Sequence, residues 1–169
     1  METGLILVVP EAEPVVRDLR ARSGPSAAAG VPAHVTILYP FRPWAAVDRH
    51  VVVRLKQILR GVRPFELSFA GVGRFPGVLW LAPEPRGPAL ALTRAITEAF
   101  PDCPPYGGGV AEPVPHLTVA MDEDEAVLDA AEKTLRGRLA APVRARIGAL
   151  DLYLHTSQGW RQRRRFRLG

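Results

Sequence analysis

The stretch AHVTILYPF, residues 33–41, sets two polar side chains into a segment that otherwise has the composition of a buried strand. Side chains two residues apart in a strand point to the same face of the sheet. His34 and Thr36 are therefore expected to share one face, while Val35 and Ile37 pack on the other. That face then carries an imidazole beside a hydroxyl, which together donate and accept hydrogen bonds.

A second stretch, VPHLTVAM at residues 114–121, repeats the pattern about 80 residues further along the chain. His116 and Thr118 occupy one expected face, and Leu117 and Val119 occupy the other. A single histidine in a strand is usually a structural residue with a local hydrogen-bond partner. The chain has only four histidines, however, and two of them fall at matching positions. This repetition predicts a shared function for the two motifs.

The order of expected elements also repeats. Each half shows a strand, a helix, a His-x-Thr strand, a second helix and a third strand. The expected strands are 4–9, 33–39, 65–72, 77–83, 115–121, 143–154 and 159–168, and the expected helices are 12–23, 46–61, 87–100 and 122–139. This order predicts one α+β domain over residues 1–169, with lobes formed by halves of roughly 1–75 and 76–169. An approximate two-fold axis between the lobes would set the two His-x-Thr strands across a shared groove.

The composition fits a folded protein in a reducing compartment. Hydrophobic residues make up 47% of the 169 residues and charged residues 23%, which is enough to build a core. Cys103 is the single cysteine, so no internal disulfide is expected, and a cytoplasmic location follows as the default. The apolar run GLILVVP is far shorter than the roughly 18–20 residues that span a bilayer. No membrane partner or signal peptide is expected.

The positive charge is local. The net charge is +5, and the ending WRQRRRFRLG, residues 160–169, contains five arginines and no acid. Strict alternation predicts a basic face with Arg161, Arg163, Arg165 and Arg167. This row either lines a route to the groove and contacts an RNA backbone, or protects an exposed sheet edge. Arg164 falls on the packed face, where it would reach a phosphate or pair with a buried acid.

Two imidazoles and two hydroxyls around one small site suit a phosphate group. A neutral histidine can take a proton from water while a protonated one gives a proton to the leaving oxygen. The threonine hydroxyls can donate to the non-bridging oxygens, and no metal is required. Zinc is the rival hypothesis, but a zinc site usually adds a third protein ligand, and neither motif supplies one nearby.

At these residues the chain resembles the 2H phosphoesterase superfamily, which includes the RNA 2′,3′-cyclic phosphodiesterases also called 2′-5′ RNA ligases. The two motifs are HVTI and HLTV, and the resemblance extends to VTILYPF, GVGRFPGVLWLAP, FPDCPPYGGG and the ending GWRQRRRFRLG. It implies two lobes, each a mainly antiparallel sheet with helices on its outer face, around a central groove. It also implies metal-independent, cofactor-free chemistry on 2′,3′-cyclic phosphates or 2′-5′ linkages. By this resemblance His116 is the base, His34 is the acid, and Thr36 and Thr118 hold the phosphate.

Further substrate-binding candidates are aromatic. Tyr39 lies five residues after His34, so strict alternation puts it on the opposite face, and Phe41 lies beyond the expected strand end. Either ring, or Tyr106 in its glycine-rich loop, would stack on a base or simply pack in the core. Arg164 is the fourth candidate. His155 and the remaining histidine, in the helix at 46–61, are expected at the surface.

The leading hypothesis is a phosphodiesterase whose substrate is an RNA 2′,3′-cyclic phosphate end or a cyclic nucleotide. A non-catalytic RNA- or nucleotide-binding protein that uses the same groove is the alternative. The reverse reaction, 2′-5′ ligation, is open to the same two histidines. We expect a monomer, and the sequence leaves the physiological substrate and the ester bond that breaks undecided.

Overall fold

The computed structural model describes residues 1–110 and 112–169, and within them the strands form two four-stranded sheets. The first sheet has the order β2-β1-β7-β8 and the second β5-β4-β3-β6, and every neighbouring pair is antiparallel. The first sheet comprises β1 (Thr3–Val8), β2 (His34–Leu38), β7 (Ala149–Thr156) and β8 (Gly159–Arg167). The second comprises β3 (Phe65–Phe75), β4 (Val78–Glu84), β5 (Leu117–Met121) and β6 (Val143–Ile147). The α+β class and the two-lobed antiparallel arrangement are thus confirmed.

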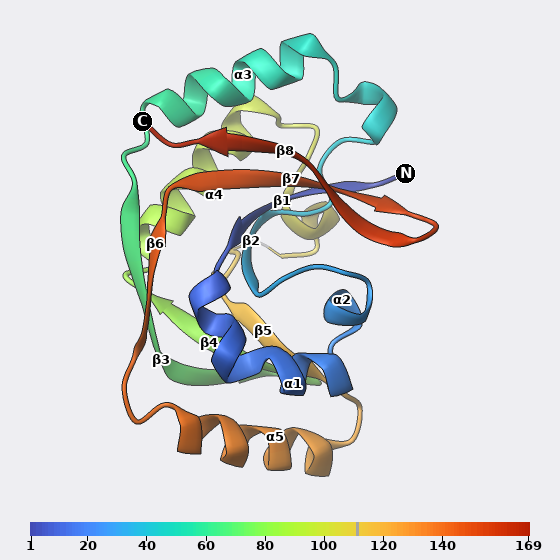
Figure 1. Cartoon of the computed structure of the whole chain (residues 1–169). Coiled ribbons are helices and arrows are strands. Elements are labelled where there is room, and N and C mark those ends of the chain that lie inside the picture. Colours follow the sequence, from blue (N-terminus) through green and yellow to red (C-terminus); the bar gives the residue numbers. More distant parts are fainter. Residues whose placement is uncertain (111) are drawn as a thin grey trace.

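The helices cover the outer faces of the sheets (Figure 1). Helices α3 (Arg49–Arg60) and α4 (Gly87–Ala99) pack on the first sheet, and α1 (Glu13–Ser23) and α5 (Glu125–Arg138) pack on the second. The short elements are α2 (Pro25–Ala28), η1 (Pro10–Ala12), η2 (Trp44–Ala46) and η3 (Pro105–Gly108). No helix in the described part of the chain has both the length and the apolar character needed to cross a membrane.

The lobes are not the two contiguous halves that the sequence suggests. The third strand of the first half, β3, pairs with β4 of the second half, and β7 pairs with β1 of the first half. Helices α1 and α4 are likewise exchanged between the lobes. The expected boundary near residue 75 is therefore wrong as a boundary between lobes, because each sheet takes strands from both halves. The order of expected elements repeats as described, but that order does not specify which sheet each strand joins.

The segment 143–154 is two strands rather than one. It leaves the second sheet at Ile147, passes through Gly148 and enters the first sheet at Ala149. Alternating apolar residues continue through both pieces, so the hydrophobic pattern gives no sign of the change of sheet. This crossing ties the two lobes together at the edge and centre of their sheets.

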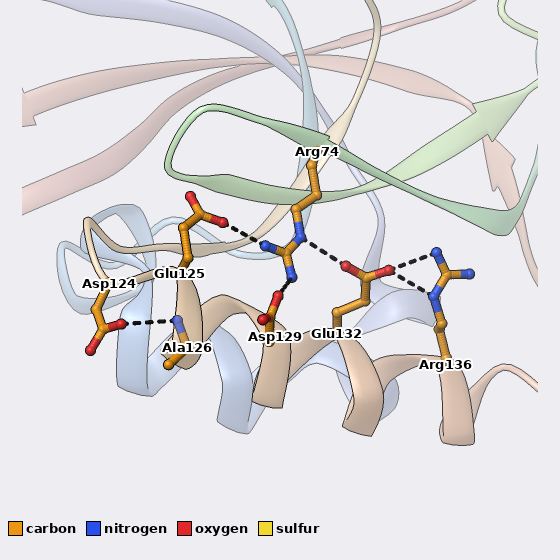
Figure 2. A network of polar contacts seen from close by, with 7 residues as sticks. All are labelled: Arg74, Asp124, Glu125, Ala126, Asp129, Glu132 and Arg136. Carbon is orange, nitrogen blue, oxygen red and sulfur yellow. Dashed lines mark hydrogen bonds and ion pairs between the residues drawn. The ribbon is translucent and has the colours of Figure 1, made fainter.

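A network of ion pairs holds α5 against the hairpin of β3 and β4 (Figure 2). Arg74, near the end of β3, reaches Glu125 at 2.8 Å, Asp129 at 2.6 Å and Glu132 at 2.7 Å. These acids are spaced at roughly one turn along α5, so one guanidinium contacts a whole face of the helix. Glu132 also accepts a hydrogen bond from Arg136.

Candidate active site

A cavity of about 890 Å³ lies between the two sheets and contains both His-x-Thr motifs. We call it the central cavity; its lining includes His34, Thr36, His116, Thr118, Tyr106 and Trp160. His34 and Thr36 come from β2; His116 immediately precedes β5, and Thr118 lies in it. Strands β2 and β5 are the corresponding edge strands of the two sheets and contact each other. The approximate two-fold arrangement thus brings the four residues into one space.

The two imidazoles are held in the same way. His34 Nδ1 lies 2.7 Å from the carbonyl oxygen of Pro32, and His116 Nδ1 lies 2.7 Å from that of Val114. A carbonyl oxygen only accepts hydrogen bonds, so Nδ1 carries the proton in each ring. This leaves Nε2 of each ring to act as a base when it is neutral and as an acid when it is protonated.

The electrostatic surroundings of the two histidines differ. Burial lowers the pKa of His34 to about 4, against the opposing effect of the Pro32 carbonyl, and the buried Arg20 lowers it further. Burial also lowers the pKa of His116, and the Val114 carbonyl opposes this shift. Both rings therefore favour the neutral form at neutral pH, and an anionic phosphate placed between them raises both pKa values.

A pair of charged residues in α1 positions the segment that leads into His34. Glu13 Oε1 accepts a hydrogen bond from the Ala33 amide at 2.6 Å. Arg20 donates to the Val31 carbonyl at 3.1 Å and lies 3.7 Å from Glu13. Arg20 is only 3% exposed, so this pair fixes the backbone just before the histidine from within the protein.

A β-bulge in β2 corrects the expected position of Tyr39. Ile37 is an extra residue, because Thr36 and Leu38 pair with consecutive residues of β1. Ile37 and Leu38 are both buried, so the next side chain, Tyr39, returns to the face of Thr36 and lines the central cavity. Thr93 of α4 donates a hydrogen bond to the Ile37 carbonyl at 3.0 Å. Bulges often redirect side chains beside active sites in this way.

A matching bulge in β5 adds a residue that the sequence analysis missed. Val119 is the extra residue here, since Thr118 and Ala120 pair with consecutive residues of β4. Val119 and Ala120 are buried, and Met121 returns to the central cavity. The repeat offset that relates His34 to His116 also relates Tyr39 to Met121, which is the signal that could have identified it.

An aromatic cluster lies at the first-sheet side of the cavity. Trp160 stacks on His155 with ring centroids 4.9 Å apart, and Tyr39 meets Trp160 edge-on at 5.6 Å. The Tyr39 hydroxyl donates to Glu2 at 2.7 Å. His155 is exposed, as expected, and it also lines the cavity, because the hairpin of β7 and β8 turns its side chain to the groove.

A second aromatic cluster supports His116 from the second sheet. Phe75 meets the His116 ring edge-on at 5.2 Å and stacks on Trp80 at 4.9 Å. Trp80 lies over Gly73, where an added Cβ would come within 2.3 Å of the indole. Tyr106 completes the lining as expected, held by a hydrogen bond from its amide to the Tyr39 carbonyl at 2.8 Å.

Phe41 is a wrong substrate-binding prediction. Its side chain is 5% exposed and packs edge-on against Phe100, with ring centroids 5.2 Å apart, in the hydrophobic core. Its amide donates to the Thr3 carbonyl at 2.8 Å, so the chain after β2 runs back along β1. This path carries the ring away from the groove.

Arg164 is also wrong as a cavity residue. A bulge at Arg163 in β8 puts Arg164 opposite the buried Leu152, on the face away from the cavity, where it is exposed. The bulge also divides the expected basic face, since Arg163 lies over the Trp44 ring and Arg165 lies 3.8 Å from Asp151. Asp151 is the buried acid in this strand pair.

Within the described ranges, no three histidine, cysteine, aspartate or glutamate side chains are grouped so as to hold a metal ion. The remaining histidine, His50, is exposed on α3. The cavity itself offers imidazoles, threonine and tyrosine hydroxyls and aromatic surfaces.

A model of the 2′-5′ RNA ligase superfamily matches residues 8–159. The chain belongs to this superfamily. The resemblance to 2H phosphoesterases is thus confirmed, and membership supports an enzyme of the phosphoesterase or ligase type that acts on RNA or nucleotides. No curated protein matches the chain.

Solved structures share the fold along almost the whole chain. TT0787 of Thermus thermophilus is 18% identical with a TM-score of 0.62, covering 99% of this chain and 98% of its own. E. coli LigT, solved with 3′-AMP, is 17% identical with a TM-score of 0.65, covering 99% of this chain and 97% of its own. Kluyveromyces marxianus Usb1 is 16% identical with a TM-score of 0.55, covering 95% of this chain and 96% of its own.

Proposed function

We propose that the protein is a metal-independent phosphodiesterase that hydrolyses a 2′,3′-cyclic phosphate or a 2′-5′ phosphodiester. The observation that carries this proposal is the pair of histidines in one cavity, each with Nδ1 bound to a backbone carbonyl and Nε2 left for proton transfer. The paired threonines add hydroxyl donors beside each imidazole. The superfamily supplies independent support for phosphodiesterase-type activity.

In the proposed reaction, the neutral histidine takes a proton from water as the water oxygen attacks phosphorus. The bond from phosphorus to one ribose oxygen breaks, and the protonated histidine donates its Nε2 proton to that oxygen. Thr36 and Thr118 donate to the non-bridging oxygens as negative charge increases there. The products are a phosphate monoester and a free ribose hydroxyl. Each acid–base group typically contributes about 10²–10⁴-fold to the rate.

The surroundings of the two histidines favour His34 as the base. The positive charge of Arg20 disfavours protonation of His34. Burial also lowers the pKa of His34 more than that of His116. When a phosphate anion raises both pKa values, His116 is then the first ring to become protonated. This assignment is the reverse of the one implied by the resemblance.

Wild-type turnover in the presence of a chelator tests the proposal. The substrate is a nucleoside 2′,3′-cyclic phosphate, followed by ³¹P NMR, which distinguishes the strained cyclic diester from the monoester product. We expect conversion to a single monoester isomer, whose identity also reveals which ester bond breaks. Binding without any conversion would instead support the nucleotide-binding alternative. Joined 2′-5′ product formed only at high substrate concentration would identify ligation as the reverse reaction.

A further inference from the structure

The central cavity has an unusual charge balance for a site that is to receive a phosphate. Within the described part of the chain, Glu112 is the only lining residue with a formal charge at neutral pH when the histidines are neutral. Among the described residues, no lysine or arginine lines the cavity, although the chain contains 22 of them. The other lining residues are mostly apolar or aromatic. The charge of a bound phosphate is therefore met by one protonated histidine and by hydroxyl donors.

Three arginines near the cavity are engaged with other groups. Arg20 lies behind His34, where it binds the Val31 carbonyl and pairs with Glu13. Arg165 faces Asp151, and Arg163 lies over the ring of Trp44. None of these three guanidinium groups lines the central cavity.

The two bulges place uncharged side chains next to the motifs. Tyr39 follows the first motif and directs its hydroxyl to Glu2, and Met121 follows the second. Met121 is 44% exposed, pairs with Val78 of β4 and lines the cavity, so a longer side chain could extend from this position into the cavity. A lysine or arginine at position 121 would place a positive charge near the phosphate, but the methionine there is uncharged.

We propose, building on the function proposed above, that the substrate is a small cyclic phosphodiester with a single negative charge, and that the cavity rejects substrates with further phosphate groups. One protonated histidine balances one phosphate charge. A second phosphate would lose its hydration beside apolar side chains and Glu112 without a compensating cation, which is strongly unfavourable. Specificity would then come from the penalty on the wrong substrate.

The size and shape of the cavity fit this substrate class. A volume of about 890 Å³ lies within the usual range for small-molecule sites and accommodates a sugar and base along with the phosphate. The stacked pair of His155 and Trp160 offers an aromatic surface on which a base could stack, for about 1–3 kcal/mol. An RNA end would bring its additional backbone phosphates to the same uncharged space.

The same charge balance predicts that the cavity binds the product more weakly than the substrate. Ring opening converts a diester with one negative charge into a monoester with a charge of about −1.5 to −2 at neutral pH. The product then carries more charge than the cavity neutralises. This mismatch favours product release after each turnover.

Three substrates with the same base test the proposal. They are adenosine 2′,3′-cyclic phosphate, the same compound with a 5′-phosphate, and a short oligonucleotide that ends in adenosine 2′,3′-cyclic phosphate. We expect kcat/KM to fall at least about tenfold for each of the two substrates with added phosphates. Equal or higher kcat/KM for either one would overturn the proposal, and a preference for the oligonucleotide would identify RNA ends as the substrate.

Substitution of Met121 by arginine should lessen this discrimination. The Met121→Arg variant adds a cation at an exposed position in the cavity, so the kcat/KM ratio between the unmodified and 5′-phosphorylated nucleotides should move toward one. Met121→Leu is the matched control and should preserve the wild-type ratio. Thermal unfolding of both variants checks that they are folded. An unchanged ratio in folded Met121→Arg would contradict the charge explanation.

A binding measurement separates this inference from the proposed function. Calorimetric titration of the His34→Ala variant, which keeps His116, and of wild type if it shows no turnover, gives the ratio of Kd for the two mononucleotides. Weaker binding of the 5′-phosphorylated compound supports the charge inference even where hydrolysis fails. Equal affinity, or no binding of either nucleotide, overturns it.

Discussion

At the level of single residues, the proton positions in the two imidazoles determine how the site can act. The Pro32 and Val114 carbonyls fix the proton on Nδ1 of each ring, so both rings present Nε2 for proton transfer. The pair of Glu13 and Arg20 supports only His34, and no equivalent pair of described residues is hydrogen-bonded to the segment before His116. This asymmetry within an otherwise symmetric site leads to a prediction about roles.

The roles of the histidines can be separated with a leaving group that needs no proton. For a nucleoside p-nitrophenyl phosphodiester, nitrophenolate leaves as an anion, so loss of the general acid should matter little. We expect His116→Ala to retain most of the wild-type rate on this substrate, whereas His34→Ala loses it. Initial rates of nitrophenolate release measure this directly. The opposite pattern would make His116 the base, as the family resemblance implied.

The depressed pKa of His34 also predicts a pH-dependent contribution to stability. In the unfolded chain its pKa lies near 6.5, and in the folded protein near 4, so the unfolded state binds more protons between these values. Stability contributed by neutral His34 is fully present above pH 6.5 and is lost as the pH falls toward 4. We therefore expect His34→Gln to lose less stability than wild type on acidification over this range, as measured by urea unfolding. Parallel losses in both proteins would show that His34 titrates normally.

At the scale of elements, the paired bulges decide which side chains reach the cavity. Strict alternation gives the correct faces for the histidines and threonines, and it fails for Tyr39 because Ile37 is an extra residue. It also fails along β8, where the bulge at Arg163 divides the expected basic face. No glycine or proline marks these bulges in the sequence. Pairing between distant strands determines them, so a local pattern cannot show them.

The hydrogen bond from Thr93 to the bulged residue is expected to be important for the site. Thr93→Val keeps the shape of the side chain but leaves the Ile37 carbonyl without its donor, which should cost about 1–3 kcal/mol of unfolding free energy. We also expect kcat/KM to fall, because Tyr39 follows this bulge. Thr97→Val, which removes only a hydrogen bond within α4, is the control for denaturant unfolding and kinetics. Equal effects of the two substitutions would argue against a special role of the bulge.

The ion pairs of Arg74 hold α5 against the sheet, so their contribution to stability should decrease as the salt concentration rises. Arg74→Met removes the contacts to Glu125, Asp129 and Glu132 on α5 (Figure 2). We expect a lower Tm than wild type at low ionic strength, and a smaller difference in high salt because screening weakens these pairs in the wild type. Arg86→Met, which removes an exposed pair with Glu84, should change Tm very little. A Tm difference that is independent of salt would indicate that packing of the Arg74 side chain matters more than its charge.

At the scale of the whole molecule, the repeat in the sequence predicts the meeting of the two motifs but not the path of the chain. The sheet orders β2-β1-β7-β8 and β5-β4-β3-β6 correspond strand by strand. Strand β3 of the first half and strand β7 of the second nevertheless join the other half's sheet, a choice set by pairing in three dimensions. The exchange binds the two walls of the cavity together through the chain itself. This construction suits a site whose acid and base come from different sheets.

Both histidines are predicted to transfer protons, and the turnover numbers of two single variants test this. Hydrolysis of a nucleoside 2′,3′-cyclic phosphate in chelator is measured for wild type, His34→Ala and His116→Ala, with the exposed His50→Ala as control. We predict that each cavity variant loses at least about 10²-fold in kcat while it remains folded and still binds nucleotide, and that His50→Ala matches wild type. Wild-type turnover in either His34→Ala or His116→Ala would contradict the two-histidine mechanism.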